Sequence, residues 1–322
     1  MKVAGLCLSL ACGLLLPAHA SAEYRISGPY THENLSIFLI HGNGGGRNYL
    51  TLKDAVAQKK VVVSETKKVN ELAVENVSGE PVFIQGGDIV KGGQQDRVIS
   101  NDFVLPSKSG KVPVSAFCVE NGRWTQRGAE SARVFSSSSD MIATKDLKMA
   151  VKAKKSQTEV WREVANTQAA LGVASEVSVS ASPTSLQLTL ESKAVSKAID
   201  GYLKALSSVT THKPDVVGFA FAISGDVNSA DVYSSPALFA AMWPKLLRSS
   251  AVEAAGRPHR DSRFEPPTPA TIKAFLSEAE DGRQSTVDID QRVKLVTLEN
   301  EKQMLFESRE NAGWIHRNYI KK

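Results

Sequence analysis

The stretch Val82–Leu105 reads VFIQGGDIVKGGQQDRVISNDFVL, with apolar runs at both ends and two glycine pairs between them. Runs rich in β-branched and aromatic residues, bounded by glycine, are typical of strands joined by tight turns. We expect Val82–Ile84 to run as a strand into the glycine pairs, and Arg97–Leu105 to return as a strand. The stretch therefore predicts antiparallel sheet.

The same strand signals extend on both sides of this stretch, from Ile37 to Val119. Asn121-Gly122 adds the strongest short hairpin signal, because type I′ turns need positive φ at both central positions. Helix signals follow: a capping box at Ser156–Glu159, and serine before proline at Ser235-Pro236. We predict an α+β fold, with a mostly antiparallel β N-terminal half followed by helices and a C-terminal half of β-hairpin and helix.

The first 22 residues have the three-part pattern of a secretory signal peptide. Lys2 gives a positive start, Val3–Leu16 is apolar, and small residues follow. Cleavage after Ala20 and cleavage after Ala22 both fit, and both stay open. We expect residues 1–22 to be removed and the mature chain to be periplasmic or secreted. It has no further apolar segment of membrane length, so we expect no membrane association.

The mature chain divides in two by composition. Residues 23–265 form the predicted α+β domain, with one or two lobes, and residues 266–322 form a C-terminal extension of a helix and strands. The boundary lies within a polar, proline-rich run, GRPHRDSRFEPPTP at 256–269. Trp161 and Trp243 lie on apolar helical faces, so we expect both to be core anchors.

The cysteine and charge content restrict the function classes. Removal of the signal peptide leaves Cys118 alone, so we expect no internal disulfide and, from the apolar run around it, a buried and unreactive thiol. The formal net charge is +5, and the dense basic cluster lies at Lys145–Lys155. We expect this cluster to be a solvated helix face or loop. No aromatic residue lies between its lysines, which argues against nucleic-acid binding.

Several kinds of active site lack their residues. The five histidines outside the signal peptide are scattered, so we predict no metal site, and we expect no cofactor. The run His41–Tyr49, HGNGGGRNY, is similar to the glycine-rich oxyanion loop of esterases, but the sequence lacks the G-x-S-x-G motif that accompanies such loops. We expect a flexible loop between a strand and a helix.

The two glycine pairs remain as the candidate site. Paired glycines let successive backbone N–H groups converge on an anion. Lys91 and Arg97 would add positive charge, and Asp88 and Asp96 are the candidate catalytic carboxylates. The candidate ligand-binding residues are Gln85, Gly86, Gly87, Asp88, Lys91, Gly92, Gly93, Gln94, Gln95 and Arg97. The alternative is two β-turns whose charged residues face water, and the pattern alone leaves both interpretations open.

Residues 69–124, which contain this stretch, resemble the ARG-and-rhodanese-phosphatase-superfamily-associated protein family of bacteria. SQTEVW at 156–161 and VVGFAFAISGDVNSADVY at 216–233 are similar to later segments of the same family, so the resemblance covers roughly residues 35 to 260. The family is named for genomic association with ADP-ribosylglycohydrolases, which implies a role in NAD or ADP-ribose metabolism.

Together with the predicted signal peptide, the resemblance implies an exported protein that binds or processes a small anionic ligand, of nucleotide or ADP-ribose type, at Gln85–Arg97. It implies no particular reaction, and whether the protein is an enzyme stays open. The alternative function is a non-catalytic interaction module of the cell envelope, in which the glycine pairs are structural turns.

Overall fold

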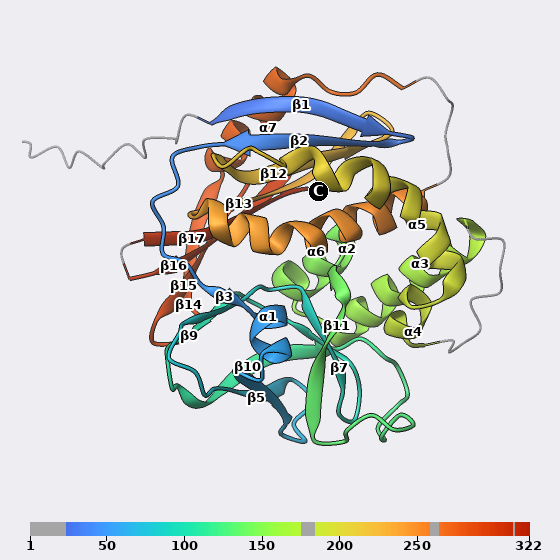
Figure 1. Cartoon of the computed structure of the whole chain (residues 1–322), viewed down its shortest axis with the longest axis vertical. Coiled ribbons are helices and arrows are strands. Elements are labelled where there is room, and N and C mark those ends of the chain that lie inside the picture. Colours follow the sequence, from blue (N-terminus) through green and yellow to red (C-terminus); the bar gives the residue numbers. More distant parts are fainter. Residues whose placement is uncertain (1–23, 175–183, 258–263, 312) are drawn as a thin grey trace, which may run out of the picture.

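The computed structural model describes residues 24–174, 184–257, 264–311 and 313–322 (Figure 1). The predicted signal peptide lies outside the described residues. The chain forms a large antiparallel sheet, a small closed barrel and a three-stranded sheet, together with helices. This mixture confirms the predicted α+β class, including the mostly antiparallel N-terminal half.

The large sheet combines strands from both ends of the chain. In spatial order its antiparallel strands are β1 (Arg25–His32), β2 (Leu35–His41), β12 (Val216–Ile223), β13 (Asp226–Tyr233), β17 (Gly313–Lys321), β16 (Gln303–Glu310), β15 (Val293–Glu299) and β14 (Arg283–Asp288). β17 lies between β13 and β16, so residues after 265 complete the middle of the sheet.

Helices cover both faces of this sheet. α6 (Pro236–Ala255) packs on the face that carries Leu39 and Phe219, and α7 (Pro269–Glu280) packs on the face that carries Ile40 and Ala220. β2 and β12 are consequently buried at every residue, which suits the nearly unbroken apolar sequence of β12.

The stretch Val82–Leu105 supplies four strands to two different sheets. The closed barrel has the order β10 (Gly110–Cys118), β5 (Glu71–Asn76), β4 (Val61–Glu65), β11 (Val134–Ile142), β7 (Asp88–Gly92) and β8 (Arg97–Ile99). The small sheet has the order β3 (Leu50–Thr51), β6 (Val82–Ile84) and β9 (Phe103–Leu105). Each glycine pair lies at one end of β7, where the chain must turn.

The remaining helices pack beside α6 and the barrel (Figure 1). They are α1 (Leu52–Ala57), α2 (Lys145–Met149), the π-helical turn η1 (Ala150–Lys154), α3 (Gln157–Ala174), α4 (Leu186–Leu190), α5 (Lys193–Leu206) and the 3₁₀ turn η2 (Ser207–Thr210). Among the described residues, no helix is both long and apolar enough to cross a membrane.

Sequence patterns within a few residues predicted helix caps correctly, whereas the prediction of which strands pair was less successful. The caps at Ser156 and Ser235 are confirmed, since each side-chain hydroxyl accepts a hydrogen bond from the N–H three residues later. Cys118 is buried as predicted, and burial raises the pKa of its thiol. The prediction of a hairpin at Asn121-Gly122 is wrong. These residues lie in the loop after β10, and β10 pairs with β5 and β8 rather than with the next strand along the chain.

Candidate functional site

The structure divides the predicted glycine-rich site into two groups at opposite ends of β7. Gln85–Asp88 lies at the start of the strand, where the Gln85 side chain reaches Asp231 of the large sheet. Gly92–Arg97 forms the turn from β7 to β8 at the other end. Lys91 directly precedes Gly92 and therefore belongs to the second group. Its Nζ lies 2.7 Å from Glu191 Oε1.

The backbone N–H groups of both glycine pairs already bind acceptors within the protein. Gly86 donates to Asp102 Oδ1 at 2.7 Å, and Gly92 donates to Asp96 Oδ1 at 2.9 Å. The N–H groups of Gly87 and Gly93 donate to backbone carbonyls. Each glycine pair therefore holds one carboxylate, as the sequence predicted for an anion, but the carboxylate belongs to the protein itself.

The second group is a network of ion pairs at the end of the barrel. Arg127 contacts both carboxylate oxygens of Asp96, with distances of 2.9 and 3.1 Å. Arg97 is completely buried, with Nη2 3.4 Å from Glu65 Oε2 and its guanidinium 5.3 Å from the centre of the Trp124 ring. Gln94 joins the same network, since its N–H donates to Glu65 Oε2. The carbonyl and side-chain oxygens of Gln95 accept hydrogen bonds from Arg97.

The first group belongs to a larger set of buried charges where the large sheet, the helices and the barrel meet. We call this set the buried charged cluster. It consists of Asp88, Asp102, Asp231, Lys148, Lys152, Lys245 and His316. All seven side chains have exposed fractions of 6% or less, so water screens their charges poorly. Buried titratable groups brought together in this way mark candidate functional sites.

His316 bridges two carboxylates and must carry a positive charge to do so. Its Nδ1 lies 2.8 Å from Asp102 Oδ2, and its Nε2 lies 3.0 Å from Asp231 Oδ1. Both ring nitrogens donate only in the imidazolium form. Burial would lower the pKa of His316, but Asp102 and Asp231 raise it above its ordinary value. Tyr233 stacks on the imidazole with 4.7 Å between ring centres.

The same charge pairs lower the pKa values of Asp102 and Asp231. Burial would raise the pKa of Asp102, but His316 and Lys152 hold it well below its usual range. For Asp231, Lys148 and His316 outweigh burial and lower the pKa to about 2. Asp88 receives hydrogen bonds from Lys245 Nζ and from the N–H of Gln85.

Lys152 has the longest ion-pair contact among the cations of the cluster, and its Nζ lies over the Phe306 ring, 5.4 Å from the ring centre. Its Nζ lies 3.9 Å from Asp102 Oδ1 and makes no hydrogen bond to the residues that the structure describes. Burial lowers the pKa of Lys152, against the attraction of Asp102. Lys152 lies in the π-helical turn η1, a distortion that is frequent at functional sites.

The cluster therefore contains more positive than negative groups. Lys148, Lys152, Lys245 and His316 face the carboxylates of Asp88, Asp102 and Asp231. Glu253 also lies near enough to act on Lys148, and burial raises its pKa. Within the seven side chains of the cluster the cationic groups outnumber the carboxylates by one, and a buried excess of this kind is removed by deprotonation or balanced by an anion.

A family model matches the chain from residue 23 to residue 320, and it describes the ARG and Rhodanese-Phosphatase-superfamily-associated Protein domain. The chain belongs to this family. The match confirms the resemblance seen in the sequence and extends it through the C-terminal strands, including the strand that carries His316. No curated protein and no solved structure matches the chain.

In this family member, a cavity of about 350 Å³ lies beside the segments that carry Asp102 and Lys152, although none of the seven cluster residues is among its lining. Asn101 and Val151 help to line it. A Cβ placed on Gly86 would meet the Asn101 backbone at 3.0 Å and Lys152 Cε at 2.8 Å. The Asn101 turn and η1 thus contribute both to the cavity and to the surroundings of Lys152, and glycine at 86 lets the three segments approach.

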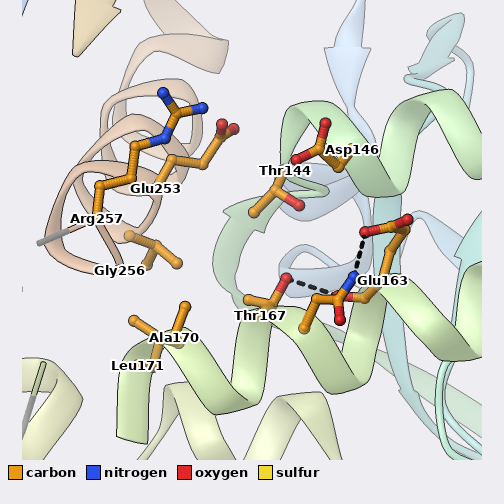
Figure 2. Close-up of a pocket in the computed structure, with 11 residues that line it drawn as sticks. Thr144, Asp146, Glu163, Thr167, Ala170, Leu171, Glu253, Gly256 and Arg257 are labelled. Carbon is orange, nitrogen blue, oxygen red and sulfur yellow. Dashed lines mark hydrogen bonds between the residues drawn. The ribbon is translucent and has the colours of Figure 1, made fainter. Parts of the chain in front are cut away.

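Figure 2 shows a second pocket, of about 190 Å³, between α2, α3 and α6. Asp146, Glu163 and Glu253 give it an acidic lining, with Arg257 at its edge. Glu253 accepts hydrogen bonds from the N–H of Lys145 and from Asn228 Nδ2. The carboxylates that line this pocket suit hydroxyl or cationic groups of a ligand better than an anion.

The expected solvated lysine face at Lys145–Lys155 is wrong for its two central members. Lys148 and Lys152 are buried, because the four-residue spacing directs both side chains toward the carboxylates of the cluster. Lys154 and Lys155 are exposed as expected. The burial of the two lysines could have been predicted from the sequence, because the apolar residues Leu147 and Val151 directly precede them and are buried with them. Asp102, Asp231 and His316 had no such signal, because their partners are distant in the sequence.

Proposed function

We propose that this chain is an exported protein that binds or processes a small anionic ligand, of nucleotide or ADP-ribose type, beside the buried charged cluster. The excess of cationic side chains around Lys152, whose ammonium has no hydrogen-bond acceptor among the described residues, carries the proposal. A phosphate oxygen would supply both the acceptor and the missing negative charge.

The surroundings of Lys152 support this class of ligand. The adjoining cavity, of about 350 Å³, is within the range of small-ligand sites. Its lining includes Asn70, Ser100 and Ser115, which offer hydrogen bonds to ribose or base. Gly86-Gly87 would contribute by allowing close approach, and Asp88 by orienting Lys245.

A non-catalytic interaction module is the second candidate. The observation that favours it is the occupation of both glycine pairs by the protein's own carboxylates, Asp102 and Asp96. In that case the glycine pairs are structural turns, and no small anion stabilises the protein.

Replacement of Lys152 by Met separates the two candidates. We expect K152M to raise the unfolding temperature without ligand, because it removes a poorly compensated buried charge and keeps the side-chain volume. Wild-type protein should be stabilised by inorganic phosphate, ADP or ADP-ribose, by about 2.7 kcal/mol at 100 times the dissociation constant. K152M should lose this response.

The matched control is K197M, at an exposed lysine on α5. It should leave the ligand response unchanged. Thermal unfolding of the mature protein with each anion, at two salt concentrations, provides the measurement. The absence of any anion response in the wild type would favour the interaction module, and an equal response in K152M would remove Lys152 from the site.

A further inference from the structure

A serine, a histidine and an aspartate meet at one end of the large sheet, away from the buried charged cluster. Ser27 Oγ lies 2.7 Å from His41 Nε2. His41 Nδ1 lies 3.0 Å from Asp215 Oδ1, a contact without hydrogen-bond geometry, and this nitrogen has no hydrogen-bond partner among the described residues. Arg25 Nη2 holds the other Asp215 oxygen at 2.7 Å.

Strand pairing brings Asp215 to Ser27 and His41, which lie 14 residues apart on two consecutive strands. Ser27 is on β1, His41 ends β2, and Asp215 immediately precedes β12. Across the strands, Ser27 pairs with Leu39, and His41 pairs with Val216. Paired residues share a face, so Ser27 and His41 lie on the face of the sheet that α6 covers, as Leu39 does. His41 is 5% exposed and Ser27 is half-buried.

The glycine-rich loop follows His41 directly. Gly42, Gly44 and Gly46 use their N–H groups in backbone hydrogen bonds. The N–H groups of Asn43 and Gly45 make no hydrogen bond to the described residues, so both are available as donors. A Cβ on Gly44 would come 2.5 Å from Pro236 Cδ, so this position needs glycine for its close contact with the start of α6.

A cavity of about 250 Å³ is lined by chain neighbours of this arrangement, together with Thr210 and Lys213, although Ser27, His41 and Asp215 are not among its lining residues. Pro214 precedes Asp215, Val216 is the strand neighbour of His41, and Pro236 touches the glycine-rich loop; all three line the cavity. Phe239, Ala237 and Ala240 add apolar surface from α6. A cavity of this size and lining fits a short acyl chain.

We propose that Ser27 and His41 are the catalytic residues of an ester hydrolase for small, apolar acyl groups, with Asp215 as the residue that positions His41. The sequence showed the loop but not its serine, because Ser27 comes from a neighbouring strand rather than from a G-x-S-x-G motif. This activity goes beyond the proposed anion site and uses none of its residues.

The reaction follows the Ser-His-Asp scheme. With the His41 Nδ1–H facing Asp215, Nε2 accepts the hydroxyl proton as Ser27 Oγ attacks the ester carbonyl carbon. The C–O bond to the alcohol breaks, and the alcohol leaves with the proton from Nε2. Water then gives a proton to Nε2 while its oxygen bonds to the acyl carbon. The bond between that carbon and Ser27 Oγ breaks, Oγ takes the proton back from Nε2, and the acid is released. The loop N–H groups are the donors for the negative oxygen of each tetrahedral intermediate.

The test uses the mature protein with p-nitrophenyl acetate and butyrate, and a fluorophosphonate probe. We expect ester turnover and one probe molecule per chain, attached to Ser27 by peptide mapping. S27A and H41Q should lose turnover by on the order of 10³-fold or more. S285A, at an exposed serine on β14, should match the wild type. D215N should lower kcat and leave KM nearly unchanged, as expected for a positioning residue.

Peptide mapping of the wild type needs no folded variant, so the proposal is testable even if S27A is unstable. Label on another serine, no label, or turnover that persists in folded S27A would overturn it. K197M, at an exposed lysine that belongs to neither site, should retain full esterase activity. The anion response of folded S27A should match that of the wild type, so failure here and failure of the anion site are separate results.

Discussion

At His316 one imidazolium serves two buried carboxylates, and its removal should leave both without their shared cation. We predict that H316Q lowers the free energy of unfolding by about 3–5 kcal/mol, the usual cost of removing one partner from a buried ion pair. Urea unfolding of wild type and variant near pH 6 provides the measurement. H212Q, at an exposed histidine, is the control and should cost little.

The pH dependence of this cost follows from the direction of each shift. The pKa values of Asp102 and Asp231 are lowered from 3.8, so their contribution is present above that value and is lost as pH falls through the folded pKa values. The pKa of His316 is raised from 6.5, so its contribution is complete below 6.5 and is lost as pH rises through the folded pKa. The difference between wild type and H316Q should therefore be largest between these values and shrink in alkaline solution. A constant difference would contradict the imidazolium assignment.

At the scale of single elements, α6 is the helix that joins the parts of the molecule. It runs through Pro244 as one helix. Trp243 packs against Phe219 and Phe239, with ring centres 5.5 and 5.8 Å away, and its Nε1 donates to the carbonyl of Ser207. Trp161 on α3 is only half-buried, and its buried Nε1 has no partner among the described residues, so the prediction that it is a core anchor is wrong.

The two tryptophans should therefore differ in their contribution to stability. W243A should lower the free energy of unfolding by about 3–5 kcal/mol, because it removes a buried aromatic ring and leaves a cavity. W161A should cost clearly less. Chemical denaturation of both variants, compared with wild type, tests the difference, and equal losses would restore Trp161 to the core.

The elements also show what the sequence could predict. The first residues of α6 and α7 were predictable, because Ser235 and Thr268 cap the N-termini of these helices by accepting hydrogen bonds from the N–H three residues later. The pairing of β10 with β5 and β8 was not, since a turn such as Asn121-Gly122 carries no information about which strand edges are free. The sequence did not predict the candidate sites for the same reason. The contacts of Ser27 with His41 and of Asp102 with His316 exist only in the folded chain.

At the scale of the whole molecule, the buried charged cluster depends on residues from every part of the fold. Asp88 and Asp102 come from the barrel and the adjoining turn, Lys148 and Lys245 from helices, and His316 from the last strand of the large sheet. Such a cluster costs desolvation energy, so its charges are tolerated only while all parts are in place. The division expected at residue 265 would remove His316 and leave Asp102 and Asp231 without it.

We therefore predict that residues 23–265 do not fold alone. The truncation removes β14–β17, which exposes the edge of β13 and leaves the buried residues Ala230 and Val232 without the neighbouring strand. Circular dichroism and urea unfolding should show no cooperative transition for 23–265, whereas 23–322 should unfold cooperatively. A peptide of residues 266–322 should restore the transition when added in trans, and the same peptide with H316Q should restore it less well. Cooperative unfolding of 23–265 alone would instead make the C-terminal strands a separable extension.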